Sequence, residues 1–145
     1  MPPPVKEKKK ILLVDDSEII RLYFRDIFWI HGLDSKYDLN ICGDVEKAKQ
    51  IVKDPLTRPS LVFSGLVMPI KQGNKTVSSP EAGFSFLSEL KSDPELKKIH
   101  VIIFSAYDDK KYQDRAKELG ADSFLAKQEN MPRELVQFIE NLNIK

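Results

Sequence analysis

The chain has 145 residues, of which 41% are hydrophobic and 31% charged, and it contains a single cysteine. This length predicts one domain that can bury a core of its own, and one cysteine excludes an intramolecular disulfide. We therefore expect a reducing, cytoplasmic location. Because the apolar runs are short, the sequence predicts neither a secretory signal nor a membrane span, and no membrane partner is expected.

The positive charge of the chain is concentrated at its beginning. Residues 1–10 carry a net charge of +3 within a total of +1, so residues 11–145 carry −2. A slightly acidic body argues against nucleic-acid binding, since binding to phosphates requires a basic surface. We interpret residues 1–10 as a flexible basic tail, with an electrostatic contact arm as the alternative, and residues 11–145 as a single folded domain.

Short apolar runs alternate with amphipathic stretches along the chain. Runs of three or four apolar residues predict buried strands, and apolar residues spaced by three or four predict helices. The expected strands are 11–14, 35–42, 61–63, 101–104 and 123–126. The expected helices start after Ser17 and at Asp44, cover 82–90 and 107–119, and end with a helix from Pro132 to Leu142. The strand at 35–42 alternates polar and apolar residues, which favours an edge position.

Five strands that alternate with five helices predict a single α/β sandwich with a parallel sheet. Right-handed crossovers then place the carboxyl ends of all strands at one edge, where such sheets bind ligands. Residues 70–80 are predicted to form a mostly polar loop near this edge, either a flexible insertion or a lid or partner contact. We expect Trp29, near the end of the first helix, to serve packing.

Polar residues and one glycine lie at the ends of four expected strands. Asp15 and Asp16 follow the first strand, Gly65 lies near the end of the third, Ser105 follows the fourth and Lys127 follows the fifth. Two carboxylates, a hydroxyl and a lysine at one edge suit a divalent cation such as Mg²⁺ and a phosphoryl group. Taken singly, each has a simpler interpretation: a helix cap, a turn hydroxyl and a solvated lysine.

Together these residues resemble the response-regulator receiver domain, the chemotaxis-regulator type of two-component signalling. The resemblance covers about residues 10–143 and rests on the segments 11–17, 66–69, 104–106 and 120–127. It implies a flavodoxin-like, doubly wound α/β fold with five parallel strands in the order 2-1-3-4-5. It also implies Mg²⁺ at Asp15 and Asp16, phosphorylation of an aspartate by a histidine kinase, and a switch made of Ser105 and Phe124, with Lys127 at the phosphate site.

The sequence departs from the family pattern at the phosphoacceptor. In the family, the acceptor aspartate lies four residues before the proline of a Met-Pro pair. Counting back from Pro69 gives Gly65, which has no side chain to phosphorylate. Since two carboxylates remain, we expect Lys127 to pair directly with Asp15 or Asp16 and Mg²⁺ to bind weakly or not at all.

Two further departures lie near the same edge. Gly83 is the better match to the glycine that precedes the family's third helix, so residues 70–80 become an insertion of about ten residues relative to the family. Gln128 follows Lys127 where the family often has a proline. The loop with Gln128 borders the surface that the family uses for partners, and residues 70–80 lie at the active edge and could cover it.

The favoured interpretation is a stand-alone receiver-like protein that acts by protein–protein contacts, without aspartyl phosphorylation and without enzymatic activity. Its partners would be a histidine kinase or a downstream signalling protein. One alternative is a metal-dependent phosphotransfer enzyme or phosphatase with Asp15 as nucleophile, although Ser17 stands where a second, acid–base aspartate is needed. Another is a flavodoxin-like cofactor binder, although no glycine-rich loop follows the first strand.

Overall fold

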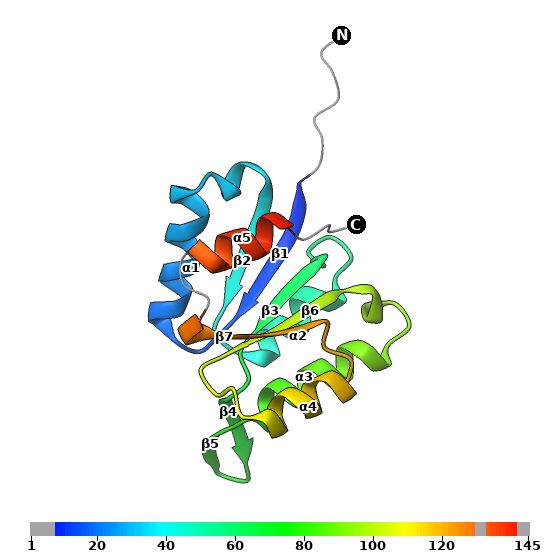
Figure 1. Cartoon of the computed structure of the whole chain (residues 1–145). Coiled ribbons are helices and arrows are strands. Elements are labelled where there is room, and N and C mark those ends of the chain that lie inside the picture. Colours follow the sequence, from blue (N-terminus) through cyan, green and yellow to red (C-terminus); the bar gives the residue numbers. More distant parts are fainter. Residues whose placement is uncertain (1–7, 130–132, 142–145) are drawn as a thin grey trace.

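The computed structural model describes residues 8–129 and 133–141. Its centre is a sheet of five parallel strands in the order β2-β1-β3-β6-β7 (Figure 1). The strands are β1 (Lys9–Val14), β2 (Tyr37–Cys42), β3 (Leu61–Ser64), β6 (His100–Ser105) and β7 (Ser123–Ala126). Since β6 and β7 are the fourth and fifth strands of this sheet, the expected order 2-1-3-4-5 and the edge position of β2 are confirmed.

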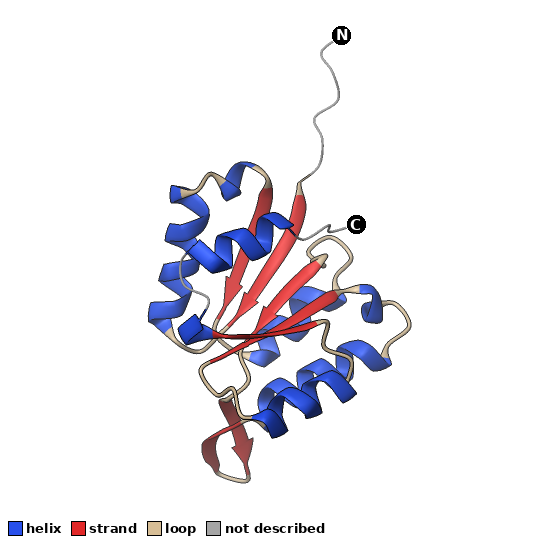
Figure 2. Cartoon of the chain, viewed as in Figure 1, coloured by secondary structure: helices blue, strands red, loops and turns tan. Residues whose placement is uncertain are grey.

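Helices cover both faces of the sheet (Figure 2). One face packs against α1 (Glu18–Ile30) and α5 (Arg133–Asn141), and the other packs against α2 (Val45–Lys53), α3 (Glu81–Ser92) and α4 (Lys110–Glu118). Short 3-10 helices lie at Leu33–Ser35, Leu96–Lys98 and Lys127–Glu129. Within the described ranges, no helix has the length and apolar character needed to cross a bilayer. Pro132, Leu142 and residues 1–7 of the expected tail lie outside the described residues.

Side-chain alternation along β1 builds a core on each side of the sheet. Ile11 and Leu13 belong to the cluster beneath α1 and α5, whereas Leu12 and Val14 belong to the cluster beneath α2, α3 and α4. All four side chains are fully buried. The strand that carries Asp15 at its end is therefore held from both sides, which fixes the position of that carboxylate.

Several element boundaries differ from the sequence prediction. The second strand begins at Tyr37 instead of residue 35, because Leu33–Ser35 form a 3-10 helix. The strand β1 begins at Lys9, because Lys9 and Lys10 pair with the first residues of β2. The last two residues of the expected tail therefore belong to the sheet. The fourth helix begins at Lys110 instead of residue 107, because the preceding residues form the loop after β6.

The prediction that residues 70–80 form a loop is wrong, because these residues form most of a β-hairpin. Its antiparallel strands are β4 (Met68–Gln72) and β5 (Lys75–Ser79). Gly73 and Asn74 join them, and Gly73 has a φ of 62°. A two-residue turn with a positive φ is typical of tight hairpins. Figure 1 shows this hairpin projecting from the body of the protein beside the start of α3.

The prediction that Trp29 serves packing is wrong, because its side chain is 73% exposed. The helix α1 carries apolar residues on two faces. Phe24, Ile27 and Phe28 fill the core on the inner face. Trp29 lies on the outer face, so it adds nothing to the interior of the isolated chain.

Cys42, at the end of β2, offers a direct test of this packing. Burial raises the pKa of the Cys42 thiol to about 11. At about pH 8 almost none of it is thiolate, which is the reactive form. We expect iodoacetamide to modify native protein much more slowly than urea-denatured protein, as measured by intact mass. Equal rates in the two samples would show that the end of β2 is open.

Candidate functional site

Neighbouring strands end together and bring the predicted site residues to one edge of the sheet. β1 and β3 end side by side, as do β6 and β7. Asp15, Gly65 and Lys127 directly follow β1, β3 and β7, and Ser105 is the last residue of β6. The parallel topology therefore places at one edge residues that are more than 100 positions apart in the sequence.

Asp15 and Lys127 form an ion pair at this edge. The Lys127 Nζ lies 2.8 Å from Asp15 Oδ2, and the lysine and aspartate side chains are 20% and 2% exposed. The second carboxylate oxygen, Asp15 Oδ1, accepts a hydrogen bond of 2.9 Å from the Ser17 N–H. The expected pairing of Lys127 with the acidic pair is confirmed, with Asp15 as its partner. Because the pair is shielded from water, each charge depends on the other for its stability.

Asp16, the second member of the acidic pair, is exposed, and the ion pair is formed by Asp15 and Lys127 without it. Mg²⁺ binds through several oxygen ligands, usually with at least one carboxylate free to coordinate it. Asp15 is already engaged by Lys127. Over residues 8–129 and 133–141, no group of three or more His, Cys, Asp or Glu side chains is arranged to hold a metal ion. The residues present therefore fit Mg²⁺ poorly.

Gly65 leaves this edge without a third carboxylate. Its N–H donates a hydrogen bond of 2.8 Å to the Val14 carbonyl, so the backbone continues the pairing of β3 with β1. A Cβ atom on Gly65 would lie 3.6 Å from Asp15 Oδ2 and 3.4 Å from Met68 Sδ, which are ordinary contact distances. A side chain here would fit and would lie beside the Asp15 carboxylate. The buried Ser64 hydroxyl instead donates to the Gly65 carbonyl at 2.9 Å.

Ser105 and Phe124, the expected switch residues, are both ordered by local contacts. The Ser105 hydroxyl oxygen accepts a hydrogen bond of 3.0 Å from the Tyr107 N–H, and Ser105 is 2% exposed. Phe124 is half-buried and packs against the core beneath α2, α3 and α4. The turn contact of Ser105 matches the simpler interpretation of that residue, and a switching role for the two side chains stays a prediction.

A contact that the sequence did not predict joins two loops beside the ion pair. Gln128 Nε2 donates to Asp108 Oδ2 at 3.1 Å, and Gln113 Nε2 donates to the Asp108 carbonyl at 2.6 Å. Gln128 stands out in the sequence as a departure from the family's proline, but nothing in the sequence indicates its partner. The contact ties the loop between β6 and α4 to the end of β7, which restricts the movement of that loop.

Gly83 allows α3 to pack closely against the segment that follows Gly65. Its N–H donates to the Leu66 carbonyl at 3.0 Å. A Cβ atom on Gly83 would lie only 2.6 Å from the Gly65 carbonyl oxygen and from Leu66 Cα. Because these atoms belong to the backbone, they cannot move aside without shifting the chain.

The substitution Gly83→Ala is therefore expected to lower the free energy of unfolding by about 1–3 kcal/mol through overpacking. The matched control is Ser85→Ala at an exposed position of the same helix. Its effect should stay within about 0.5 kcal/mol. Urea unfolding followed by circular dichroism measures both. Equal stabilities of the two variants would contradict the close packing at Gly83.

The chain is similar in sequence to known proteins over most of its length. Residues 11–140 match the family described as the response regulator receiver domain. The chain is 31% identical over 123 residues to a probable chemotaxis protein CheY of Rhizobium etli, over 85% of this chain and 84% of that protein. It is 25% identical over 134 residues to the polar-differentiation response regulator DivK of Brucella anthropi, over 92% and 93% of the two chains.

Similarity in three dimensions extends over the same length. The crystal structure of the Mn²⁺-bound form of response regulator Rcp1 matches with a TM-score of 0.71 and 25% identity, covering 94% of this chain and 95% of that chain. The matched family region contains the ion pair of Asp15 and Lys127 together with Ser105 and Gly65. From sequence and fold together, the chain belongs to the response-regulator receiver family of two-component signalling.

Proposed function

We propose that this protein is a receiver-like signalling module that acts through protein contacts and is not phosphorylated on an aspartate. The observation that carries the proposal is Gly65 directly after β3, at a position where a Cβ atom would lie 3.6 Å from Asp15 Oδ2. Family resemblance assigns this position to the acceptor aspartate, and a glycine provides no carboxylate. The neighbouring Ser64 hydroxyl is bound to a backbone carbonyl and is buried.

Asp15 is a poor substitute for the acceptor. Its Oδ2 pairs with Lys127 and its Oδ1 accepts the Ser17 N–H, so both oxygens have partners. Attack by Asp15 on a phosphoryl donor would require one of these oxygens to give up its present partner, and it would add further negative charge at a buried position. These contacts favour a structural role for Asp15 and speak against the alternative of a phosphotransfer enzyme that uses it as nucleophile.

We also propose that Mg²⁺ binds weakly, because Lys127 supplies the positive charge next to Asp15 that a metal would otherwise supply. The ammonium group and a cation would compete for one carboxylate, and only the exposed Asp16 remains for the metal. Calorimetric titration with Mg²⁺ should give little heat. Tight binding would contradict this part of the proposal.

The proposed partners are a histidine kinase or a downstream signalling protein in the cytoplasm. Support comes from the relatives, which are described as a chemotaxis protein and a response regulator. The β4–β5 hairpin adds exposed Lys71 and Lys75 near the edge of the sheet that carries Asp15. This hairpin is a candidate contact that the insertion provides, whereas no nucleic-acid or membrane partner is proposed.

The test is hydrogen–deuterium exchange in the β6–α4 loop and in β7, with and without Mg²⁺ and acetyl phosphate. A covalently attached phosphoryl group would change hydrogen exchange in this region by stabilising one conformation of the loop over another. Because we propose that the protein has no phosphoacceptor aspartate, exchange rates with and without the phosphodonor should be the same. Exchange that slows in this region when the phosphodonor is added would contradict the proposal.

A further inference from the structure

The outer face of α1 carries an exposed apolar stripe. Of the six large apolar side chains that are exposed in the described part of the chain, four lie on this helix: Ile19, Leu22, Trp29 and Ile30, which are 77%, 46%, 73% and 68% exposed. Their spacing places them along one side of the helix, opposite the face that is buried in the core. Apolar side chains grouped in this way indicate a surface that another molecule covers.

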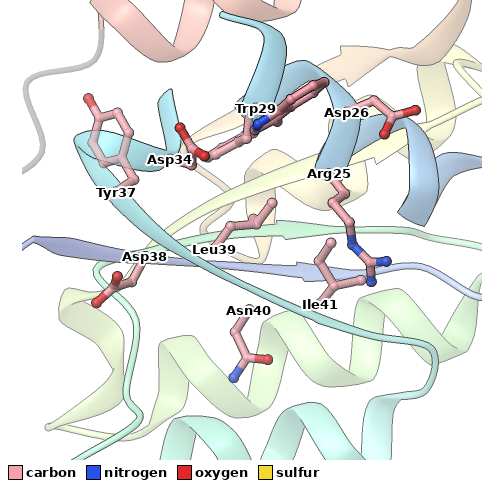
Figure 3. A pocket seen from close by; sticks show the side chains of 10 residues that line it. Arg25, Asp26, Trp29, Asp34, Tyr37, Asp38, Leu39, Asn40 and Ile41 are labelled. Atoms are coloured by element: carbon pink, nitrogen blue, oxygen red, sulfur yellow. The ribbon is translucent and has the colours of Figure 1, made fainter. Parts of the chain in front are cut away.

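A groove runs alongside this stripe, between α1 and the edge strand β2. One part encloses about 700 Å³ and is lined by residues that include Trp29, Tyr37 and Leu39 (Figure 3). A second part encloses about 480 Å³. Both parts are lined by Arg25 and Ile41, so they adjoin one another. Because β2 is the outermost strand, no further strand of the sheet covers this side.

The two ends of the groove carry opposite charges. The part near the end of α1 is lined by Asp26, Asp34 and Asp38 with Arg25. The part near the start of α1 is lined by Arg21, Arg25 and Lys47 with Glu18. Figure 3 shows Arg25 and Asp26 at neighbouring positions of α1, and Arg25 lines both parts of the groove. A surface that is acidic at one end and basic at the other is complementary to a reversed copy of itself.

We propose that this face is a homodimer interface in which the α1 helices of two copies of the chain pack antiparallel. A two-fold axis that passes between Arg25 and Asp26 places Leu22 opposite Trp29 of the second copy. The same axis places Arg25 opposite Asp26 of the second copy, and the basic end of each groove against the acidic end of the other. A single antiparallel register of the two α1 helices therefore brings apolar residues together and sets opposite charges against each other.

Trp29 provides the readout, because it is the only tryptophan in the chain and is largely exposed. Sedimentation velocity from micromolar to millimolar protein should show a monomer–dimer equilibrium. The fluorescence emission of Trp29 should shift to shorter wavelength over the same concentration range. A chain that stays monomeric throughout, leaving the face free for a different partner, overturns the proposal.

Substitutions test the register. Trp29→Glu should weaken dimerisation roughly tenfold or more, as expected for a buried aromatic at the centre of an interface. The matched control is Leu56→Glu, which replaces another highly exposed apolar residue outside α1 and should leave dimerisation unchanged. If the Trp29 variant dimerises like the control, the interface lies elsewhere.

The charged pair gives a sharper test. Asp26→Arg alone sets two cations against each other across the axis, and Arg25→Asp alone sets two carboxylates against each other, so each should weaken the dimer. The double variant restores opposite charges and should recover much of the affinity. Failure of the double variant to recover overturns the proposed register. No phosphodonor is present in these experiments, so their outcome is independent of whether an aspartate is phosphorylated.

Discussion

The substitution Gly65→Asp should create both a phosphorylatable carboxylate and a Mg²⁺ site in this protein. A Cβ atom at position 65 meets Met68 Sδ and Asp15 Oδ2 at ordinary distances, so the variant is expected to fold. The new carboxylate joins Asp15 and Asp16, and three carboxylates favour a hard cation even with Lys127 present. With acetyl phosphate and Mg²⁺, we expect one phosphoryl group per chain.

Thermal unfolding separates metal binding from phosphorylation in this variant. Without a metal, the added carboxylate repels Asp15 and should lower the melting temperature. Mg²⁺ at about one hundred times its dissociation constant should add about 2.7 kcal/mol of stability to the variant. The control is Gly65→Asn, which has a similar shape but no carboxylate, and should gain neither stability from Mg²⁺ nor a phosphoryl group. A Mg²⁺ response of equal size in Gly65→Asn would contradict this account.

The second large effect is expected from Lys127→Met, which removes the positive charge and keeps most of the aliphatic stem. Asp15 is 2% exposed and lies 2.8 Å from the lysine, so its carboxylate would remain buried without a counter-charge. Breaking such a pair from one side costs about 3 kcal/mol. Chemical denaturation at neutral pH should therefore show a large loss in the free energy of unfolding.

A double-mutant cycle identifies the cause of that loss. Asp15→Asn removes the charge and keeps a side-chain oxygen that can still accept the Ser17 N–H. Combined with Lys127→Met, it should recover a substantial part of the stability, because no buried charge is left unpaired. If the two substitutions are additive, the ion pair does not couple Asp15 to Lys127.

The central strands could be predicted because their sequences allow few other structures. Runs such as residues 11–14 and 101–104 are apolar throughout, which is typical of strands buried on both faces. The caps also followed from local chemistry: Asp44 Oδ1 accepts the Lys47 N–H at 2.8 Å at the start of α2. In both cases the signal lies within a few neighbouring residues.

The hairpin and the outer face of α1 were missed for different physical reasons. The strands β4 and β5 are largely exposed and include Pro69, so hydrophobic alternation is weak. The pair Gly73-Asn74 was the available signal, since it suits a two-residue hairpin turn. The helix α1 has apolar residues on two faces, and only tertiary packing decides that the face with Trp29 is the exposed one.

At the site, strand order was enough to bring Asp15, Gly65 and Lys127 together. Each of these residues directly follows a strand of the parallel sheet, so the strand order fixes its position independently of the conformation of the loops. The bond between Gln128 and Asp108 could not be predicted in this way. It depends on the path of a loop and on side-chain rotamers, for which the sequence has no periodic signal.

The central claim is that the wild-type chain has no phosphoacceptor at the end of β3. The most direct measurement is the intact mass of the wild-type protein after incubation with Mg²⁺ and acetyl phosphate. Gly65→Asp is treated in parallel to show that the phosphodonor is active. We predict that the wild-type mass does not change. A stoichiometric adduct of one phosphoryl group on the wild type, removed by hydroxylamine as an acyl phosphate is, would contradict the account.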